Sequence, residues 1–427
     1  MLRKNIAFLL VGTLILIGCG DKDNNEGKKS APTATTPREI SQPEACTQDA
    51  LGCTMIVAGN TIKIGTAAPL TGDSASIGIA FSQATQVAIA IANENSLNGF
   101  LFAQIDENDQ GTPEGGAEAA TRLVTAQSDG LVAVVGHAFS GASRAATPIY
   151  EAAGIPMMSP TATNPNLTQT GSKVFNRVIF NDNAQGVLMA KYLFQILNIR
   201  KLAILHDDSI YSTQLAEVTR DEFESSGGEV VIVLEVPDGA DPETYANALI
   251  EVEATQPEAI FFPGYTPEVA AVVNSLQDST MQDIVFAGSD GVNPQTFIEL
   301  TGNGSEGIYL SGESEPPESD QKTLFDTSYK ETFGVEPGIV SRSVWDAFDA
   351  ANILIQAVRK VAILGSDGNL YIPRQALVDT VRGTTDYVGA SGQIACDETG
   401  ECNMSGPDIM VIQNGELVPV PLASLKQ

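Results

Sequence analysis

The sequence predicts an α/β protein made of two doubly wound lobes with Rossmann-like parallel sheets. Short Val/Ile/Leu-rich runs alternate with longer amphipathic segments from about residue 61 onward, which is typical of βαβ units covered by helices on both faces. There are more of these units than one ordinary doubly wound domain needs. The length of 427 residues also fits two or three domains, at about 100–200 residues each.

Seven apolar runs are expected to be strands: TIKIGTA (61–67), LFAQID (101–106), LVAVVGH (131–137), KLAILHD (201–207), EVVIVLEV (229–236), EAIFFPG (258–264) and DIVFAGS (283–289). Four segments with helical periodicity lie between them: 77–95, 112–128, 182–197 and 210–227. The glycines of ESSGG (224–228) mark the end of the last of these helices.

The N-terminus predicts export. Arg3 and Lys4 precede a short apolar run, Ile6 to Ile17, which is too short for a spanning helix of about 20 residues and is typical of a signal peptide over 1–18. Its end, LIGC, resembles the bacterial lipobox and implies lipidation of Cys19. Residues 19–45 are polar and lack an apolar period, so they are expected to form a flexible linker.

The charge excludes some partners. The whole chain carries a net charge of −30, and loss of Arg3 and Lys4 would leave 21 basic against 53 acidic residues, or −32. Nucleic acid binding needs a basic surface, so it is disfavoured. Anionic ligands would be repelled on approach, whereas zwitterions and neutral solutes would not.

The five cysteines fit an exported protein with disulfides. With Cys19 lipidated, the other four allow three pairings. Their clustering favours Cys46 with Cys53, in an extension over 46–60, and Cys396 with Cys402, across the turn DETG.

Enzyme motifs are not found, so the sequence predicts no catalytic activity and no cofactor or metal. The two histidines, His137 and His206, follow strands without a G-x-S-x-G nucleophile motif. The match to G-x-G-x-x-G at 302–307 precedes a strand instead of following one, so it is interpreted as a turn. DENDQG (106–111) has Ala117 where a calcium loop has its closing glutamate.

Polar residues after strands are the candidates for a binding site, because ligands of open α/β sheets bind at the carboxyl ends of strands. The segments are GHAFSGAS (136–143), SPTATNP (159–165), HDDSIYS (206–212), GYTPE (264–268) and GSDGVNP (288–294). Structural alternatives remain at this level: helix or turn caps for Ser140, Thr161 and Thr163, a turn aspartate for Asp290, and packing for Tyr211 and Tyr265.

These segments, in this order and spacing, resemble the type I periplasmic solute-binding proteins of the leucine/isoleucine/valine branch. The resemblance runs from about residue 61 to 418 and is strongest over 136–165 and 201–216. It implies two lobes that close on a ligand and about three hinge crossovers. The implied lobes are 61–181 with 310–388, and 182–309 with 389–427.

The resemblance also implies site residues. Ser140, the backbone at Thr161, and Thr163 would hold the α-carboxylate of an amino acid. Tyr211, Tyr265 and Asp290 would come from the second lobe, with Asp290 pairing the α-ammonium. The prolines that bracket SPTATNP would keep such a cradle rigid.

The sequence departs from the family pattern at three positions. Asp290 stands where the branch has glutamate, Ile77 replaces an aromatic residue, and Phe139 replaces a small one. Together with Ala138, Ile77 and Phe139 are expected to form a reshaped wall of the side-chain pocket.

The resulting expectation is a monomeric, lipid-anchored, extracytoplasmic binding protein for an α-amino acid, branched-chain or related apolar. It would deliver the ligand to an ABC permease and its ATPase, which would be separate chains. The alternative is a sensory module whose closure signals to a membrane partner.

Overall fold

The computed structural model describes residues 42–237, 239–277, 279–402, 405–423 and 425. The predicted signal peptide, the lipidation site Cys19 and the linker up to residue 41 lie outside the described residues. Two sheets with separate hydrophobic cores confirm the predicted α/β fold with two lobes.

The first lobe is built on a five-stranded parallel sheet in the order β3-β2-β4-β5-β6. Its strands are β2 (Ile62–Ala68), β3 (Phe102–Asn108), β4 (Leu131–Gly136), β5 (Met157–Ser159) and β6 (Phe175–Arg177). The strand β4 is buried at every position. This explains its unbroken apolar sequence, since helices cover both faces of the sheet.

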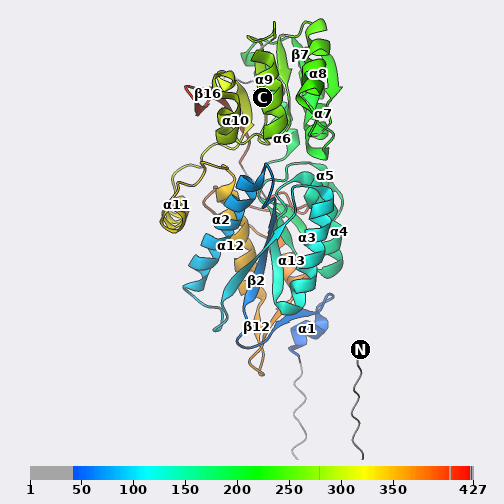
Figure 1. Cartoon of the computed structure of the whole chain (residues 1–427). Coiled ribbons are helices and arrows are strands. Elements are labelled where there is room, and N and C mark those ends of the chain that lie inside the picture. The colour runs from blue at the N-terminus through cyan, green and yellow to red at the C-terminus, as the bar shows by residue number, and fades with distance from the viewer. Residues whose placement is uncertain (1–41, 238, 278, 403–404, 424, 426–427) are drawn as a thin grey trace, which may run out of the picture. The chain divides into compact units, whose positions relative to one another are not determined.

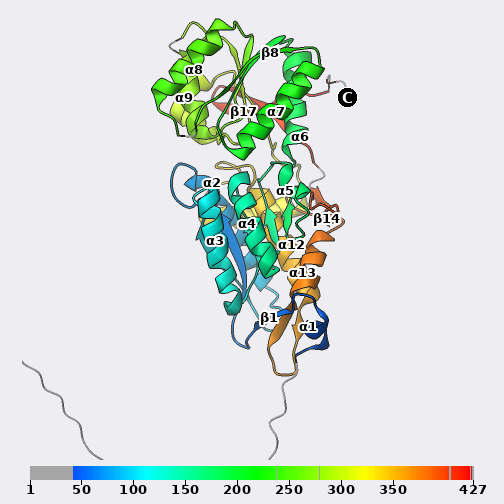
Figure 2. The same ribbon diagram turned by 90° about the vertical axis from the view of Figure 1, so that its right-hand side faces the viewer.

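Helices form a layer on each face of this sheet. One layer holds α2 (Ala75–Asn93) and α12 (Val344–Val361), and the other holds α3 (Pro113–Thr125) and α4 (Ser140–Ala153). Figure 1 shows α2 and α12, and Figure 2 turns α3 and α4 toward the viewer. Local chemistry sets their starts: Thr112 caps α3 by accepting from the Gly115 amide, and Pro113 is its first residue.

The remaining helices of this lobe are short or peripheral: α5 (Asn166–Gln169), α11 (Asp320–Phe333), α13 (Arg374–Arg382) and the 3₁₀ turn η1 (Ala126–Asp129). Among the described helices, α2 is long and apolar enough to cross a membrane by length and composition. It packs against α12 and the sheet, as a core helix does.

The second lobe is built on a seven-stranded sheet in the order β17-β16-β11-β10-β9-β7-β8. Its strands are β7 (Lys201–His206), β8 (Glu229–Glu235), β9 (Ala259–Phe261), β10 (Val285–Gly288), β11 (Tyr309–Gly312), β16 (Asp408–Gln413) and β17 (Glu416–Pro419). The five strands β7 to β11 are parallel, and the last two are antiparallel additions at one edge.

Helices also cover both faces of the second sheet. On one face lie α6 (Asp182–Lys191), continued by the π turn η2 (Tyr192–Ile196), and α7 (Ile210–Ser225). On the other lie α8 (Pro242–Ala254), α9 (Thr266–Gln277) and α10 (Pro294–Thr301), followed by the 3₁₀ turn η3 (Gly302–Ser305). Ser209 caps α7 by accepting from the Ser212 amide.

The chain crosses between the lobes three times, after β6, after β11 and between Cys402 and β16. Two of these crossings occur later in the chain than the lobe boundaries that the sequence predicted at residues 310 and 389. Residues 310–312, expected in the first lobe, belong to β11 of the second sheet. Residues up to Cys402, expected in the second lobe, pack with the first, since Cys402 is buried in the core of α2 and α12.

Both predicted disulfides are present, Cys46–Cys53 and Cys396–Cys402. The first joins α1 (Glu44–Gln48), which begins inside the expected linker, to β1 (Cys53–Ile56). That strand belongs to a small antiparallel sheet with β13 (Leu370–Pro373) and β12 (Ile363–Leu364). The second follows the pair β14 (Tyr387–Val388) and β15 (Gln393–Ile394).

Candidate ligand-binding site

The loop SPTATNP follows β5 at the carboxyl end of the first sheet, and its own side chains fix its shape. The Ser159 hydroxyl donates to the His137 carbonyl at 2.7 Å and accepts from the Ala162 amide at 2.9 Å. The Thr161 hydroxyl donates to the Ala138 carbonyl at 2.6 Å. These bonds tie the loop to the end of β4, so the carboxyl ends of two adjacent strands form one unit.

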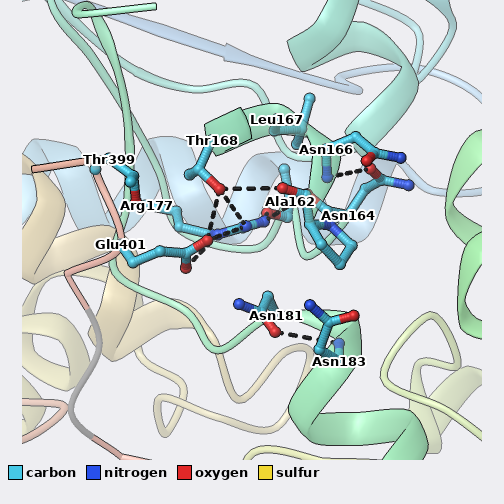
Figure 3. A network of polar contacts seen from close by, with 12 residues as sticks. Ala162, Asn164, Asn166, Leu167, Thr168, Arg177, Asn181, Asn183, Thr399 and Glu401 are labelled. Carbon is cyan, nitrogen blue, oxygen red and sulfur yellow. Dashed lines mark hydrogen bonds and ion pairs between the residues drawn. The ribbon is translucent and has the colours of Figure 1, made fainter. Parts of the chain in front are cut away.

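A buried arginine braces this loop from behind (Figure 3). The side chain of Arg177 is fully buried, and one terminal nitrogen donates to the carbonyls of Ala162 and Asn164, both at 2.8 Å. Its Nε donates to Glu401 Oε2 at 2.8 Å, and Glu401 also accepts from Thr168 at 2.7 Å. The loop is thus held by an ion pair whose acid lies one residue before Cys402.

Thr163 lies between these two braced carbonyls. Its hydroxyl is buried and has no hydrogen-bond partner of good geometry among the described residues. It lies close enough to Asp182 to favour the charged form of that carboxyl group. Thr163 therefore does not cap α5, whose N-cap is Pro165. The carboxyl group of Asp182 is the polar neighbour of its hydroxyl.

In the structure Ser140 is the first residue of α4, and the N-cap of this helix is Phe139. Ser140 therefore does not cap the helix, which was the structural alternative for it. The Ser140 hydroxyl accepts from the Asn164 amide at 3.2 Å and so joins the helix start to the loop. The N-terminus of a helix favours negative charge, because its first amides have no partner inside the helix. This end of the first lobe is suited to an anion.

The second lobe contributes an acid held by two donors. Asp290 Oδ1 accepts from the Tyr211 hydroxyl at 2.6 Å and from Gln185 Nε2 at 2.7 Å. Burial raises the pKa of Asp290, and these two hydrogen bonds oppose the rise. Asp290 caps no helix, since Asn293 caps α10. The carboxyl group is fixed in place but not neutralised by a cation.

Three aromatic rings link the two lobes beside this acid. The ring of Phe139, from the first lobe, lies 4.8 Å from that of Tyr265 in the second, measured between centroids. Tyr265 in turn lies 5.4 Å from Tyr211. Aromatic pairs at such distances contribute about 0.5–1.5 kcal/mol beyond burial. Phe139 therefore forms part of the contact between the lobes as well as a wall of the site.

The residues meet around one small cavity of about 50 Å³, called here the head-group cavity. Its lining contains eight of the nine residues expected from the sequence, all except Thr163. The full lining is Ile77, Ala138, Phe139, Ser140, Thr161, Tyr211, Tyr265, Asp290, Gly291, Ser341 and Ser343. The structure thus brings the predicted residues of both lobes together, while their roles toward a ligand stay a prediction.

A larger groove lies outside this cavity. It has a volume of about 880 Å³ and runs between α4, α5 and the start of α7. Asn164 lines this groove, and its Nδ2 donates to the Ile210 carbonyl at 2.6 Å across the lobes. None of the expected site residues lines the groove, so we place the site in the head-group cavity.

Sequence reasoning missed several polar residues near this cavity. Asp182 is fully buried, and neither of its carboxyl oxygens has a hydrogen-bond partner of good geometry among the described residues. Burial and the charge of Asp290 raise its pKa well above the ordinary value. Asp182 was interpreted only as the start of a helix, although it lies directly after the first crossing between lobes. Its position beside Thr163 was not visible in the sequence.

Ser341 and Ser343 were also missed. They lie before α12, about 200 residues from Ser140, with no strand immediately in front of them. Only the return of the chain to the first lobe brings them to the cavity. Within the described residues, no cluster of three or more His, Cys, Asp or Glu side chains is arranged to hold a metal ion.

Two lobes with separate sheets, joined by three crossings around a cavity lined by both, define a solute-binding protein of the two-lobed type. Comparison with known families agrees. Residues 61–414 match the periplasmic binding protein family model, and the chain belongs to this family. Membership places it among binding proteins rather than enzymes, as the sequence predicted.

Similar proteins include a leucine-, isoleucine-, valine-, threonine- and alanine-binding protein of Pseudomonas aeruginosa, 31% identical over 254 residues. That alignment covers 59% of this chain and 66% of the relative, slightly under two thirds of its length. A solved leucine-binding protein, LivK, from Thermotoga maritima is 25% identical with a TM-score of 0.74, covering 84% of this chain and 98% of that one.

A second solved relative is LivJ of Streptococcus pneumoniae, described as a branched-chain amino acid transporter substrate-binding protein in complex with isoleucine. It is 26% identical with a TM-score of 0.74 and covers 84% of this chain and 99% of its own. The match over nearly the whole of both solved chains confirms the predicted fold.

Proposed function

We propose that this chain is an extracytoplasmic binding protein for an α-amino acid, which it delivers to an ABC importer in the membrane. The observation that carries the proposal is the lining of the head-group cavity, which includes Ser140 and Thr161 from one lobe and Asp290 from the other. An α-amino acid carries the matching pair of charges.

The carboxylate end is assigned to the first lobe. A buried carboxylate without partners costs several kcal/mol, so donors must meet it. The start of α4 and the Ser140 hydroxyl are such groups in the cavity lining. The Thr163 hydroxyl, which lies outside this lining and beside Asp182, is expected to join them when a ligand binds. Because Arg177 and Ser159 already fix the loop, little conformational entropy is lost when a ligand binds.

The ammonium end is assigned to Asp290, with Asp182 nearby. Hydrogen bonds to charged groups contribute about 1.5–3 kcal/mol each. A cation beside Asp290 would offset the burial of this acid, which its present partners offset only in part. The names of the similar proteins, which bind leucine, isoleucine and other amino acids, support the same ligand class.

The importer and the lipid anchor are the less direct parts of the proposal. The importer is supported by the transporter named for the LivJ relative. The anchor is supported by the lipobox-like LIGC that ends at Cys19. Mass spectrometry of the exported protein tests the anchor: a diacylated Cys19 is expected, and an unmodified or absent Cys19 contradicts it.

A thermal-shift panel on the purified protein tests the ligand class. Each amino acid is compared with its amide and its des-amino analogue. A ligand at 100 times its Kd should add about 2.7 kcal/mol to the free energy of unfolding. We expect stabilisation only when both charged groups are present. Stabilisation by des-amino analogues alone would overturn the assignment.

A further inference from the structure

A second cavity adjoins the head-group cavity. It also measures about 50 Å³, and the two share Ile77, Asp290, Ser341 and Ser343 in their linings. A single water needs about 10–15 Å³ by this measure, so each cavity holds about four water-sized groups. The first cavity is thus about the size of an amino-acid head group, and the second has room for a side chain of four or five atoms.

The second cavity is lined by charged residues from both lobes. Glu313 follows β11 directly and accepts a hydrogen bond from the Ser343 hydroxyl at 2.6 Å. Arg342 also lines the second cavity, and Asp290 lines both cavities. The rest of the lining is largely apolar, with Ile77, Val292, Leu310, Val340, Met410 and Leu417 among its residues. The cavity therefore combines hydrocarbon walls, which suit a methylene chain, with charged side chains that a purely apolar pocket would not contain.

The charges around Glu313 do not cancel. Burial raises the pKa of Glu313 to about 7; the Ser343 hydroxyl and Arg342 oppose this rise, and the charge of Asp290 adds to it. Asp346 also faces Glu313, and Arg342 is shared with Glu315. Glu315 has a partner of its own, since it pairs with Lys322 at 3.0 Å, whereas for Glu313 the effect of burial exceeds that of the contacts with Ser343 and Arg342.

We propose that the side chain of the bound amino acid ends in a second ammonium group, and that Glu313 binds this group in the second cavity. The proposal rests on the proposed function, because it takes the α-ammonium to lie at Asp290. Ornithine and lysine have this chemistry and a side chain of the right length. The strongly acidic chain attracts such a cation on approach.

The other side-chain classes fit less well. An apolar side chain would leave Glu313 and Arg342 shielded from water without a new partner, which costs free energy. An acidic side chain could reach Arg342, but it would bring another negative charge beside Glu313 and Asp290. A cationic side chain would add positive charge beside Glu313 and Asp290, whose burial Arg342 offsets only in part.

Calorimetric titration of the purified protein tests the proposal with ligands of similar shape. Ornithine and lysine are compared with norleucine, leucine and glutamate at pH 8. We expect the diamino acids to bind at least about tenfold more tightly than norleucine. Tighter or equal binding of leucine, norleucine or glutamate would overturn this inference and leave the proposed function standing. Binding of none of the five, with binding of des-amino carboxylates, would overturn both.

Two variants locate the effect. Glu313→Gln should weaken ornithine binding about 10- to 100-fold, the range for loss of a charged hydrogen bond, and leave norleucine binding within about twofold. Glu318→Gln is the matched control on the same loop, because its side chain is 79% exposed. Equal losses for both ligands in Glu313→Gln, or equal losses in the two variants, would contradict a contact between Glu313 and the ligand.

The pH dependence gives a readout that a merely structural role would not change. Glu313 must be ionised to bind the ammonium group, so the affinity for ornithine should fall as the pH drops below about 7. The fall should approach tenfold per pH unit. It should be smaller for norleucine and in Glu313→Gln, where Asp290 is the acid that faces the ammonium group. A pH-independent affinity for ornithine between pH 5 and 8 would contradict the proposal.

Discussion

The two sides of the candidate site differ in how their polar groups are satisfied. On the first lobe, the carbonyls of the loop SPTATNP are bonded to Arg177, and the Ser159 hydroxyl bonds the backbone on both sides. On the opposite side, burial raises the pKa of Asp290, and in the adjoining cavity it raises the pKa of Glu313 to about 7. The loop carbonyls are satisfied without a ligand, whereas the burial of the acids on the other side is offset only in part by their partners.

This difference suggests a division of roles. The braced side contributes to folding stability and presents rigid donors to a carboxylate. The acidic side costs folding stability, and a cation bound there would recover part of that cost. Stability and affinity should therefore respond differently to changes on the two sides, which the following predictions test.

Arg177→Met should have the largest effect on stability. Removal of one partner of a buried ion pair costs about 3–5 kcal/mol, because the other charge is left without its partner. Urea unfolding measures the loss. Arg122→Met is the control, since Arg122 is 45% exposed in its pair with Glu107, and such surface pairs contribute about 0–1 kcal/mol. Equal losses in the two variants would show that Arg177 does not brace the loop.

Glu313→Gln should change how stability depends on pH. The pKa of Glu313 is raised from 4.5 to about 7, so the folded state binds more protons than the unfolded state between these values. The free energy of unfolding therefore falls as the pH rises through this window, by about 3 kcal/mol for this group. The free energy of unfolding is measured for wild type and Glu313→Gln at pH 4 and pH 8. The fall between these pH values should be larger for wild type, by about 3 kcal/mol. A difference that is constant with pH would contradict the uncompensated burial of Glu313.

Replacing both Cys396 and Cys402 by serine should cost about 2 kcal/mol of stability, the chain-entropy value for so short a loop. The same change at Cys46 and Cys53, a loop of similar length, should cost about as much. The two should differ in ligand affinity, because only the first pair adjoins Glu401 of the brace. If neither replacement changes the ligand affinity, the turn closed by Cys396 and Cys402 does not influence the site.

Phe139→Leu should have a smaller effect, about 1 kcal/mol, through loss of its contact with Tyr265. Because this contact joins the lobes, the loss should appear as faster ligand release in stopped-flow measurements. Phe194→Leu is the control, since Phe194 pairs with Phe223 within the second lobe. An equal change of release rate in both variants would contradict an inter-lobe role for Phe139.

The sequence predicted the fold well because buried parallel strands and amphipathic helices have strong local patterns, as β4 and α3 show. It predicted most of the cavity lining because residues after parallel strands lie at the carboxyl edge of their sheet: Ser140 lies at that edge of the first sheet, and Tyr211 and Asp290 lie at that edge of the second. It could not predict Glu401 beside Arg177, since that pair depends on packing between segments 224 residues apart. Glu313 directly follows β11, but the sequence does not show that this strand ends beside the cavity.

The most direct test of the account is a double-mutant cycle between Asp290 and the ligand's α-ammonium. Wild type and Asp290→Asn are titrated with an amino acid that binds and with its des-amino analogue, and the four binding free energies are combined. If the braced lobe holds the carboxylate and Asp290 holds the ammonium, the coupling should be about 2–5 kcal/mol, as for buried charge pairs. A coupling near zero, with Asp290→Asn binding both ligands as wild type does, would contradict the account.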